Sequence, residues 1–288
     1  MPAPSRPRAV VVGGANADVV ARPTRTARPA TSNPGRVSVT AGGVARNIAE
    51  VLARLGTPTT LVSAVGRDAH GDLVVEASSD AGVDLTHVHQ VDGATGAYVA
   101  LLDADGELVG AVSDMADVAL EPADLDADLL RSADVVVLDG NLPTATLAAA
   151  IDLAGDVPVA VDPVSVPKAA RIRETLAARR LFLLSAGAAE LAELSGVEAD
   201  VVWERRGPAG STLTGPEGVV DLPALLGGPV VDVTGAGDAM LGAFLHAWLG
   251  GATPAEAAAY GHAAAALTVG SAHTVRPDLT DELVRSLL

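Results

Sequence analysis

Residues 231–238 read Val-Asp-Val-Thr-Gly-Ala-Gly-Asp, and an apolar helical pattern begins directly after them at Ala239. Because Gly235 and Gly237 lack side chains, the backbone there can approach a ligand closely. A helix start also presents unpaired N–H groups and a positive dipole, which suit an anion. We therefore predict that Asp238 accepts a proton from a hydroxyl group while the neighbouring amides hold a phosphoryl group. On its own, the motif is also consistent with a tight turn whose aspartate caps the helix.

The composition narrows the class of protein. The chain has 288 residues, of which 49% are hydrophobic and 2% aromatic, so a large core must be built from Ala, Val and Leu. The net charge of −17 disfavours nucleic acid and anionic membranes as partners. The absence of cysteine excludes disulfides and thiolate chemistry. Without a signal-like or membrane-length apolar stretch, we expect a soluble cytoplasmic protein.

Short β-branched runs alternate with Ala- and Leu-rich helical patterns along the chain. The strand candidates are Val10–Val12, Thr59–Ala64, Val135–Asp139, Val157–Asp162 and Leu181–Leu184. The helix candidates are Val44–Leu55, Leu73–Ala81 and a stretch from the capping box at Thr253–Glu256 to about Val269. This alternation predicts an α/β fold with a mostly parallel sheet covered by helices on both faces.

Two segments depart from that alternation. Residues of about 19–40 are rich in Pro, Arg, Thr and Ser, and residues 96–112 have the pattern of a β-hairpin. We expect them to pair into a small sheet that serves as a lid on a single domain spanning 1–288. They are equally consistent with ordinary surface excursions.

Two further polar clusters follow predicted strands. Gly42 and Gly43 open a helix, with Asn47 one turn inside, where its amide suits sugar hydroxyls. The segment 14–18, Gly-Ala-Asn-Ala-Asp, follows the first strand at the sheet end where ligands bind in open α/β proteins. Each cluster alone is also consistent with a plain turn. The dinucleotide and P-loop motifs are absent, so a nucleotide must be held by other means.

These three clusters, in this order, resemble the ribokinase-like (PfkB) family of carbohydrate and nucleoside kinases, over nearly the whole chain. The resemblance implies a three-layer αβα sandwich with a mostly parallel central sheet and a small β lid. It also implies phosphoryl transfer from ATP to a small sugar or nucleoside. The stretches most similar to members that phosphorylate the 5′-hydroxyl of pseudouridine are 32–35, 42–49, 63–66, 113–115, 161–165 and 276–279.

The resemblance implies roles for individual residues. It implies that Asp238 is the general base. The implied anion hole consists of Gly235, Ala236 and Gly237. The implied ribose-binding residues are Asn16, Asp18, Gly42, Gly43 and Asn47. Asp114 and Lys168 are implied contacts near the uracil ring, and each fits an ordinary surface or ion-pair role equally well.

The resemblance also implies a nucleotide side and two kinds of cation. The implied ATP-binding residues are Glu190, Gly207, Gly210, Thr234 and His262. Asp232 and Thr234 resemble the family's ligands for a monovalent cation, where K⁺ would shape the anion hole. Mg²⁺ would neutralise the phosphates, with indirect help from Glu190. Glu190 is otherwise an exposed helix carboxylate.

The sequence departs from the family pattern in the segments that are expected to bind ATP. Gly187 stands where the family usually has the asparagine of an Asn-x-x-Glu segment, and the chain is short between Glu190 and Gly207. Two alternatives therefore stay open. One is the same chemistry on another acceptor, such as ribose or adenosine. The other is a nucleoside-binding pseudokinase. Lid strands of this family often pair between subunits, and the exposed edge of the hairpin would permit a homodimer.

Overall fold

The chain is organised around β1 (Ala9–Val12), whose four apolar side chains are fully buried. This is seen in a computed structural model of the protein, which describes residues 8–288. Apolar side chains on both sides of a strand require cover on both faces of its sheet. Val11 packs into one hydrophobic core, whereas Val10 and Val12 pack into another on the opposite face. The strand therefore lies in the middle of three layers.

The large sheet has nine strands in the order β13-β12-β11-β10-β9-β8-β1-β4-β5. Its pairs are parallel from β5 to β11, and β12 and β13 add an antiparallel edge. The strands besides β1 are β4 (Thr59–Gly66), β5 (Asp84–Val91), β8 (Val135–Asp139), β9 (Val159–Asp162), β10 (Arg180–Gly187), β11 (Glu198–Arg205), β12 (Ser211–Gly215) and β13 (Gly218–Leu222).

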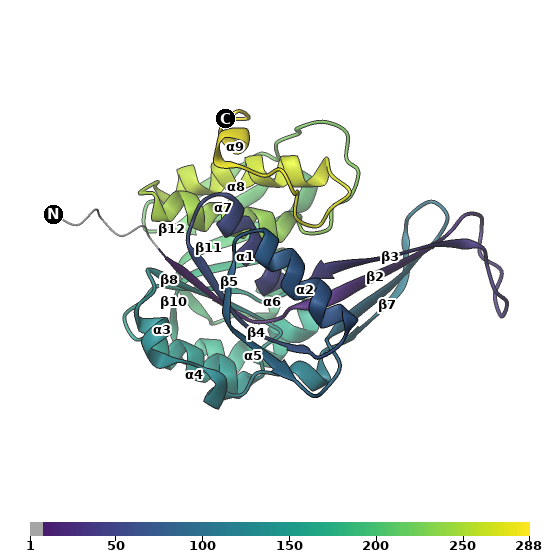
Figure 1. Cartoon of the computed structure of the whole chain (residues 1–288). Coiled ribbons are helices and arrows are strands. Elements are labelled where there is room, and N and C mark those ends of the chain that lie inside the picture. The colour runs from purple at the N-terminus through teal and green to yellow at the C-terminus, as the bar shows by residue number, and fades with distance from the viewer. Residues whose placement is uncertain (1–7) are drawn as a thin grey trace.

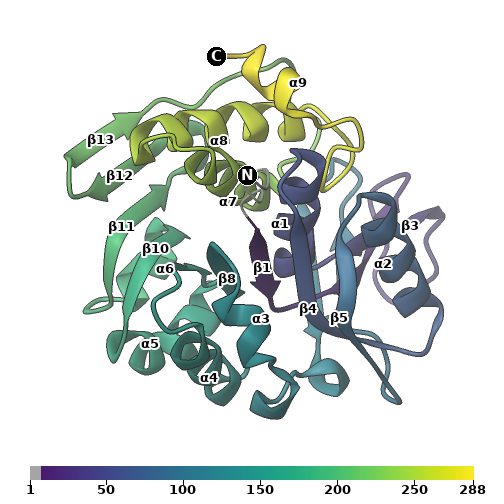
Figure 2. The same cartoon turned by 60° about the vertical axis from the view of Figure 1, so that its left-hand side comes forward.

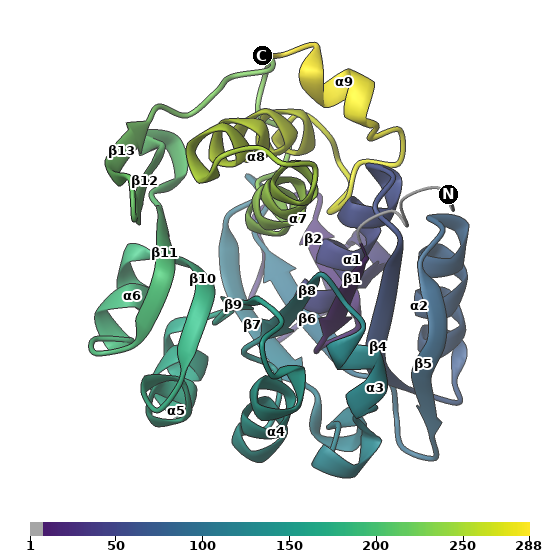
Figure 3. The same ribbon diagram turned by 90° about the vertical axis from the view of Figure 1, so that its left-hand side faces the viewer.

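Helices cover both faces of this sheet (Figures 2 and 3). One face carries α1 (Val44–Arg54), α7 (Ala236–Leu249), α8 (Pro254–Val269) and α9 (Asp281–Arg285), with α2 (Ala69–Asp80) beside β4 and β5. The other face carries α3 (Ala127–Arg131), α4 (Thr144–Ala154), α5 (Val166–Ala177) and α6 (Ala188–Glu193). Short 3₁₀ turns span Ala116–Val118, Pro122–Asp124 and Gly207–Ala209. The predicted three-layer α/β fold is confirmed.

A second sheet projects from the main body (Figure 1). Its order is β3-β2-β6-β7, formed by β2 (Asn16–Pro23), β3 (Gly35–Gly42), β6 (Ala97–Leu102) and β7 (Leu108–Asp114). Asp18 pairs with Thr40 and Tyr98, while the next residue, Val19, pairs with Val39 and Val99 on the opposite face. The two faces of this sheet therefore differ: one carries Asp18, and the other is a row of valines.

The helix boundaries agree with the sequence pattern except at α2. The box at Thr253 and Glu256 caps α8 as expected, and α1 ends one residue before the predicted position. Helix α2 begins four residues earlier than the predicted start at Leu73, because the side chain of Asp68 accepts a hydrogen bond from the amide of Gly71 and caps it. None of the described helices is long and apolar enough to cross a membrane.

Helices α1 and α7 approach each other closely through a glycine. A Cβ atom on Gly242 would lie 2.7 Å from Cγ1 of Val51 and 3.2 Å from the carbonyl oxygen of Ile48. Any larger residue at 242 would push the two helices apart. One turn nearer the helix starts, the same approach brings Asn47 of α1 against Asp238 of α7.

Candidate active site

Asp238 lies in the first turn of α7, a helix that begins directly after a glycine in the left-handed region. Gly235 has φ +78°, and a Cβ atom there would overlap the carbonyl oxygen of Thr274. The turn therefore requires glycine both for its conformation and for its space. The amides of a first helical turn have no acceptor within the helix, so the carboxylate stands beside donors suited to an anionic group.

The surroundings of Asp238 favour its protonated form in the ligand-free protein. The residue is buried, and Nδ2 of Asn47 donates a hydrogen bond of 2.8 Å to its Oδ2. Burial, followed by the charge of Asp162, raises the pKa of Asp238 to about 8, and the bond from Asn47 opposes this shift. A carboxylate whose pKa lies near neutral pH is well matched to accept a proton from a hydroxyl group.

Two more buried aspartates end neighbouring strands beside Asp238. Asp139 and Asp162 are register partners at the carboxyl ends of β8 and β9. Asp139 accepts hydrogen bonds of 3.0 Å from the amides of Gly14 and Ala45, and burial raises its pKa. It thereby ties the turn after β1 to the start of α1. Neither aspartate was predicted to be a site residue, although each ends a predicted strand.

The side chain of an arginine lies beside these three aspartates. Nη1 of Arg205, the last residue of β11, lies 2.9 Å from Oδ2 of Asp162. Its positive charge lowers the pKa of Asp238 against the larger effect of burial. Arg205 was also missed from the sequence, where it reads as one more charged residue at a strand end.

The predicted ribose-binding residues gather around the glycine pair. Nδ2 of Asn16 donates a hydrogen bond of 2.7 Å to Oδ1 of Asp18, and burial raises the pKa of Asp18. A Cβ atom on Gly42 would overlap the Asp18 carboxylate, and one on Gly43, at φ +101°, would overlap the carbonyl of Gly14. The glycines therefore let β2, β3 and the β1 turn meet, which brings a carboxylate and amide groups together as sugar hydroxyls require.

A buried arginine fixes the orientation of Asn47. Arg46 donates a hydrogen bond of 3.2 Å from Nη1 to Oδ1 of Asn47 and pairs with Glu50 one turn later. Because the amide oxygen of Asn47 is occupied in this way, its Nδ2 is directed to Asp238. Sequence reasoning passed over Arg46, since a single arginine in a helix is usually exposed.

An apolar cavity of about 300 Å³ opens beside the first turn of α7. It is lined by Arg205, Gly207, Pro208, Gly210, Ala224, Leu225, Leu226, Val230, Val233, Ala236, Gly237, Met240, His262, Ala265, Ala266 and Val269. Nε2 of His262 lies 2.7 Å from Oγ of Ser211, and burial lowers the pKa of this histidine, which favours the neutral ring. The predicted nucleotide residues Gly207, Gly210 and His262 thus share one apolar cavity, the kind of recess that accepts a flat base.

The two predicted uracil contacts lie in different surroundings. Lys168 of α5 is partly buried, donates a hydrogen bond to Oδ1 of Asn141 and feels the charge of Asp139, with burial lowering its pKa. Asp114 is exposed at the end of β7, where its carboxylate accepts a bond from the amide of Ala116. The structure therefore brings Lys168 to the acidic cluster and leaves Asp114 on the surface.

The predicted cation ligands offer oxygen donors but no closed metal site. Asp232 is exposed and accepts a hydrogen bond of 2.8 Å from the amide of Thr234, in the loop that also borders the Thr274 carbonyl. Glu190 lies over Gly187, with Oε2 2.5 Å from where a Cβ atom would be. Within residues 8–288, no three His, Cys, Asp or Glu side chains cluster as metal ligands. These donors fit cations completed by carbonyls or by substrate phosphates.

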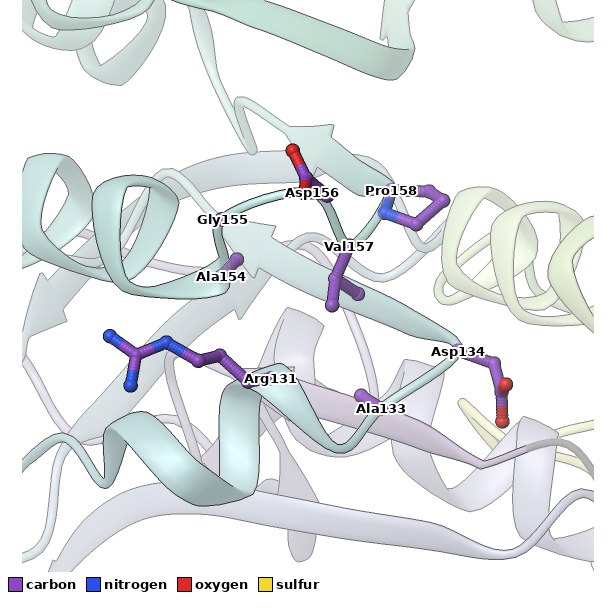
Figure 4. A pocket seen from close by; sticks show the side chains of 8 residues that line it. All are labelled: Arg131, Ala133, Asp134, Ala154, Gly155, Asp156, Val157 and Pro158. Atoms are coloured by element: carbon purple, nitrogen blue, oxygen red, sulfur yellow. The ribbon is translucent and has the colours of Figure 1, made fainter.

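A different hollow, of about 550 Å³, lies at the amino ends of β8 and β9. Figure 4 shows that its charged side chains, Arg131, Asp134 and Asp156, spread apart and do not converge. In open α/β sheets, ligands bind at the carboxyl ends of the strands. The functional site therefore belongs to the edge that carries Asp139, Asp162 and Asp238.

That edge suits phosphoryl transfer to a small hydroxyl compound, and it defines a small-molecule kinase of the α/β class. The chain belongs to the family described as "pfkB family carbohydrate kinase", which matches residues 6–281. Transfer of a phosphoryl group to a hydroxyl acceptor is the reaction that this membership supports.

Three known proteins illustrate the similarity. The pseudouridine kinase of Escherichia coli (strain K12) is 32% identical over 301 residues, covering 97% of this chain and 96% of the relative. The solved structure of a carbohydrate kinase from Agrobacterium tumefaciens has a TM-score of 0.85 at 32% identity, covering 98% and 96%. The Arabidopsis thaliana ribokinase, solved with ribose and ATP, has a TM-score of 0.81 at 25% identity and covers 98% of each chain.

Proposed function

We propose that this protein is an ATP-dependent kinase that phosphorylates the 5′-hydroxyl group of pseudouridine. The observation that carries the chemistry is Asp238, buried, hydrogen bonded to Asn47 and placed at the start of α7. The choice of substrate is supported by the similarity to a bacterial pseudouridine kinase along nearly the full length of both chains.

The acceptor binds at the glycine pair. Asn16, Asp18 and Asn47 exchange hydrogen bonds with the ribose hydroxyls, because together they offer both donors and acceptors. Of the two proposed uracil contacts, Lys168 is the better placed, since it borders Asn141 and the acidic cluster, whereas Asp114 is exposed.

Phosphoryl transfer then proceeds in line. The 5′-oxygen of the acceptor forms a bond to the γ-phosphorus of ATP, the bond from that phosphorus to the bridging oxygen breaks, and ADP leaves. The hydroxyl proton passes to the carboxylate of Asp238. The amides of the 235–237 turn stabilise charge on the transferred group, which is the largest contribution a protein makes to this reaction.

The donor nucleotide occupies the cavity beside α7. Its base fits the apolar recess near His262, and its phosphates reach the turn at Gly237. Mg²⁺, when bound, neutralises the phosphates, with Glu190 on the same side. We assign K⁺ to the loop of Asp232 and Thr234, which offers side-chain oxygens and continues into Gly235 beside the carbonyl of Thr274. We also propose that the protein acts in the cytoplasm, where ATP is available to it.

The second sheet has two uses in this proposal. Its Asp18 face closes over the acceptor as a lid, which excludes water from the transfer. Its opposite face exposes valines: Val39 is 42%, Val99 45% and Val112 68% exposed. Contiguous apolar side chains on a sheet surface are typical of a protein interface. We therefore propose a homodimer formed through the lid strands.

The test is a panel of acceptors with ATP and Mg²⁺. Pseudouridine, uridine, adenosine and ribose are each offered at equal concentration, and the formation of ADP and of the phosphorylated product is measured. We expect pseudouridine to give the highest kcat/KM. A clear preference for ribose or adenosine would replace the substrate. Binding of pseudouridine without turnover of any acceptor would support the pseudokinase alternative, which Gly187 in place of asparagine favours.

A further inference from the structure

Arg205 lies between the acidic cluster and the first turn of α7. Its Nη1 is 2.9 Å from Oδ2 of Asp162, and its side chain is 18% exposed. A Cβ atom on Gly237 would be 2.7 Å from the same Nη1 and 3.3 Å from Cζ. The guanidinium group is therefore stacked against the turn where the transferred phosphoryl group is proposed to bind.

The charge balance of this region calls for a cation. The triphosphate would approach three carboxylates, those of Asp139, Asp162 and Asp238, in a chain whose net charge is −17. Among the lining residues of the nucleotide cavity, Arg205 is the only Lys or Arg. His262 lines the same cavity, and burial favours its neutral form.

The geometry leaves donors of the guanidinium group available. Asp162 is the sole carboxylate paired with Arg205 in the described part of the chain, and the close contact is made by Nη1. A guanidinium group carries five N–H donors in a fixed fork, so Arg205 can pair with Asp162 and still donate to a second anion. Binding of phosphate by such a fork is charge-assisted and strong.

We propose that Arg205 binds the terminal phosphate of the nucleotide, held in place by Asp162 as a positioning residue. This deepens the proposed function, on which it rests. Arg205 would thus supply a positive charge to the nucleotide site. The family's asparagine, which is replaced here by Gly187, is missing from that site.

A purely structural role must be separated from this one. Arg205→Met alone leaves the buried Asp162 without its partner, which disturbs the site whether or not Arg205 touches phosphate. The double variant Asp162→Asn with Arg205→Met removes both charges together. If Arg205 serves only to neutralise Asp162, the double variant regains the wild-type affinity for ATP.

The experiment measures the binding of ATP and of adenosine by calorimetry, with Mg²⁺ present. We expect Arg205→Met to weaken ATP binding about 10- to 100-fold and to leave adenosine within about twofold, because only ATP carries the phosphates. Arg205→Lys should recover part of the loss, and the double variant should stay weak. Arg206→Met is the matched control, because Arg206 is the adjacent arginine and pairs with the exposed Asp221.

Three outcomes overturn the proposal: unchanged ATP affinity in Arg205→Met, an equal loss for adenosine, or full recovery in the double variant. Phosphate transfer by the wild-type protein is assayed separately. A wild-type protein that binds ATP through Arg205 but phosphorylates no acceptor would contradict the kinase function alone. A wild-type protein that binds no ATP would overturn both.

Discussion

The amide of Asn47 and the carboxylate of Asp238 are joined by a hydrogen bond of 2.8 Å, although 191 residues separate them along the chain. The bond depends on the close packing of α1 and α7 at Gly242, one turn further along α7 than Asp238. It links the residue proposed to hold the acceptor to the residue proposed to deprotonate it. If these roles hold, acceptor binding and the orientation of the base are coupled.

Asp238→Asn removes the proposed base and keeps the side-chain shape. We expect kcat to fall by at least about 100-fold, because asparagine cannot accept the hydroxyl proton. The measurement is steady-state turnover with the preferred acceptor. Asp72→Asn is a suitable control, since Asp72 occupies the first turn of α2 but is exposed. Near-normal turnover in Asp238→Asn would rule out its role as the base.

The activity should depend on pH through the pKa of Asp238. That pKa is raised to about 8, so the proposed base is protonated in most of the free protein at neutral pH. We expect kcat/KM to rise about tenfold per pH unit below about 8 and to level off above it. Asp162→Asn removes a negative charge that raises this pKa, so the midpoint should move to lower pH. A flat profile in the wild-type protein between about pH 6 and about pH 9 would contradict the assignment.

The stability of the fold should fall as pH rises. The folded protein keeps a proton on Asp238 up to about pH 8, whereas an aspartate in the unfolded chain has the ordinary pKa of 3.8. The folded state therefore binds more protons between these values, and this contribution to the free energy of unfolding is lost as pH increases through about 8. We expect Asp238→Asn to raise Tm by a few degrees at pH 8 and much less near pH 4, as measured by thermal unfolding. Equal Tm differences at both pH values would contradict this.

Gly42→Ala tests the acceptor side alone. The added Cβ atom would overlap the carboxylate of Asp18, which must then move away from the ribose. We expect KM for the acceptor to rise about tenfold or more, with KM for ATP nearly unchanged. Gly110→Ala, on the lid strand β7 with no atom within 4 Å of its Cβ position, should behave like the wild type. An equal rise in both KM values would place Asp18 elsewhere in the mechanism.

Val99→Glu tests the proposed dimer. A charge in the valine row formed by Val39, Val19, Val99 and Val112 should prevent two lids from associating. We expect the wild-type protein to sediment as a dimer and the variant as a monomer. Val219→Glu, which is equally apolar and 67% exposed but lies on β13, should leave the dimer intact. A monomeric wild-type protein would exclude this interface.

The strongly patterned parts of the fold were predictable from sequence. The buried strand Val135–Asp139 was placed with both ends correct, and the capping box at Thr253 marked the start of α8. The start of α2 was placed too late, because its cap Asp68 is followed by four residues, 69–72, that show no apolar pattern. The start of a helix was therefore predictable where the capping residue lies directly beside the apolar periodic pattern.

The candidate site was predictable only where glycines marked it. Gly42 and Gly237 drew attention to Asn47 and Asp238, since each glycine accompanies a turn that approaches another group. Asp162 and Arg205 are not flanked by a glycine motif of this kind. Their pairing arises from the register of β9, β10 and β11, which relates residues far apart in sequence. Register of this kind is a property of the assembled sheet and leaves no local trace.

The order of the strands has a consequence for the growing chain during synthesis. Strand β1 lies between β4 and β8, and α1, which follows it in the first quarter of the chain, packs against α7 from the last quarter of the sequence. The N-terminal residues proposed to bind the acceptor are thus made first, but the helix that packs against them emerges from the ribosome much later. Until then, the apolar side chains of α1 that pack on α7 remain exposed to solvent, and a chain released early would be prone to aggregation.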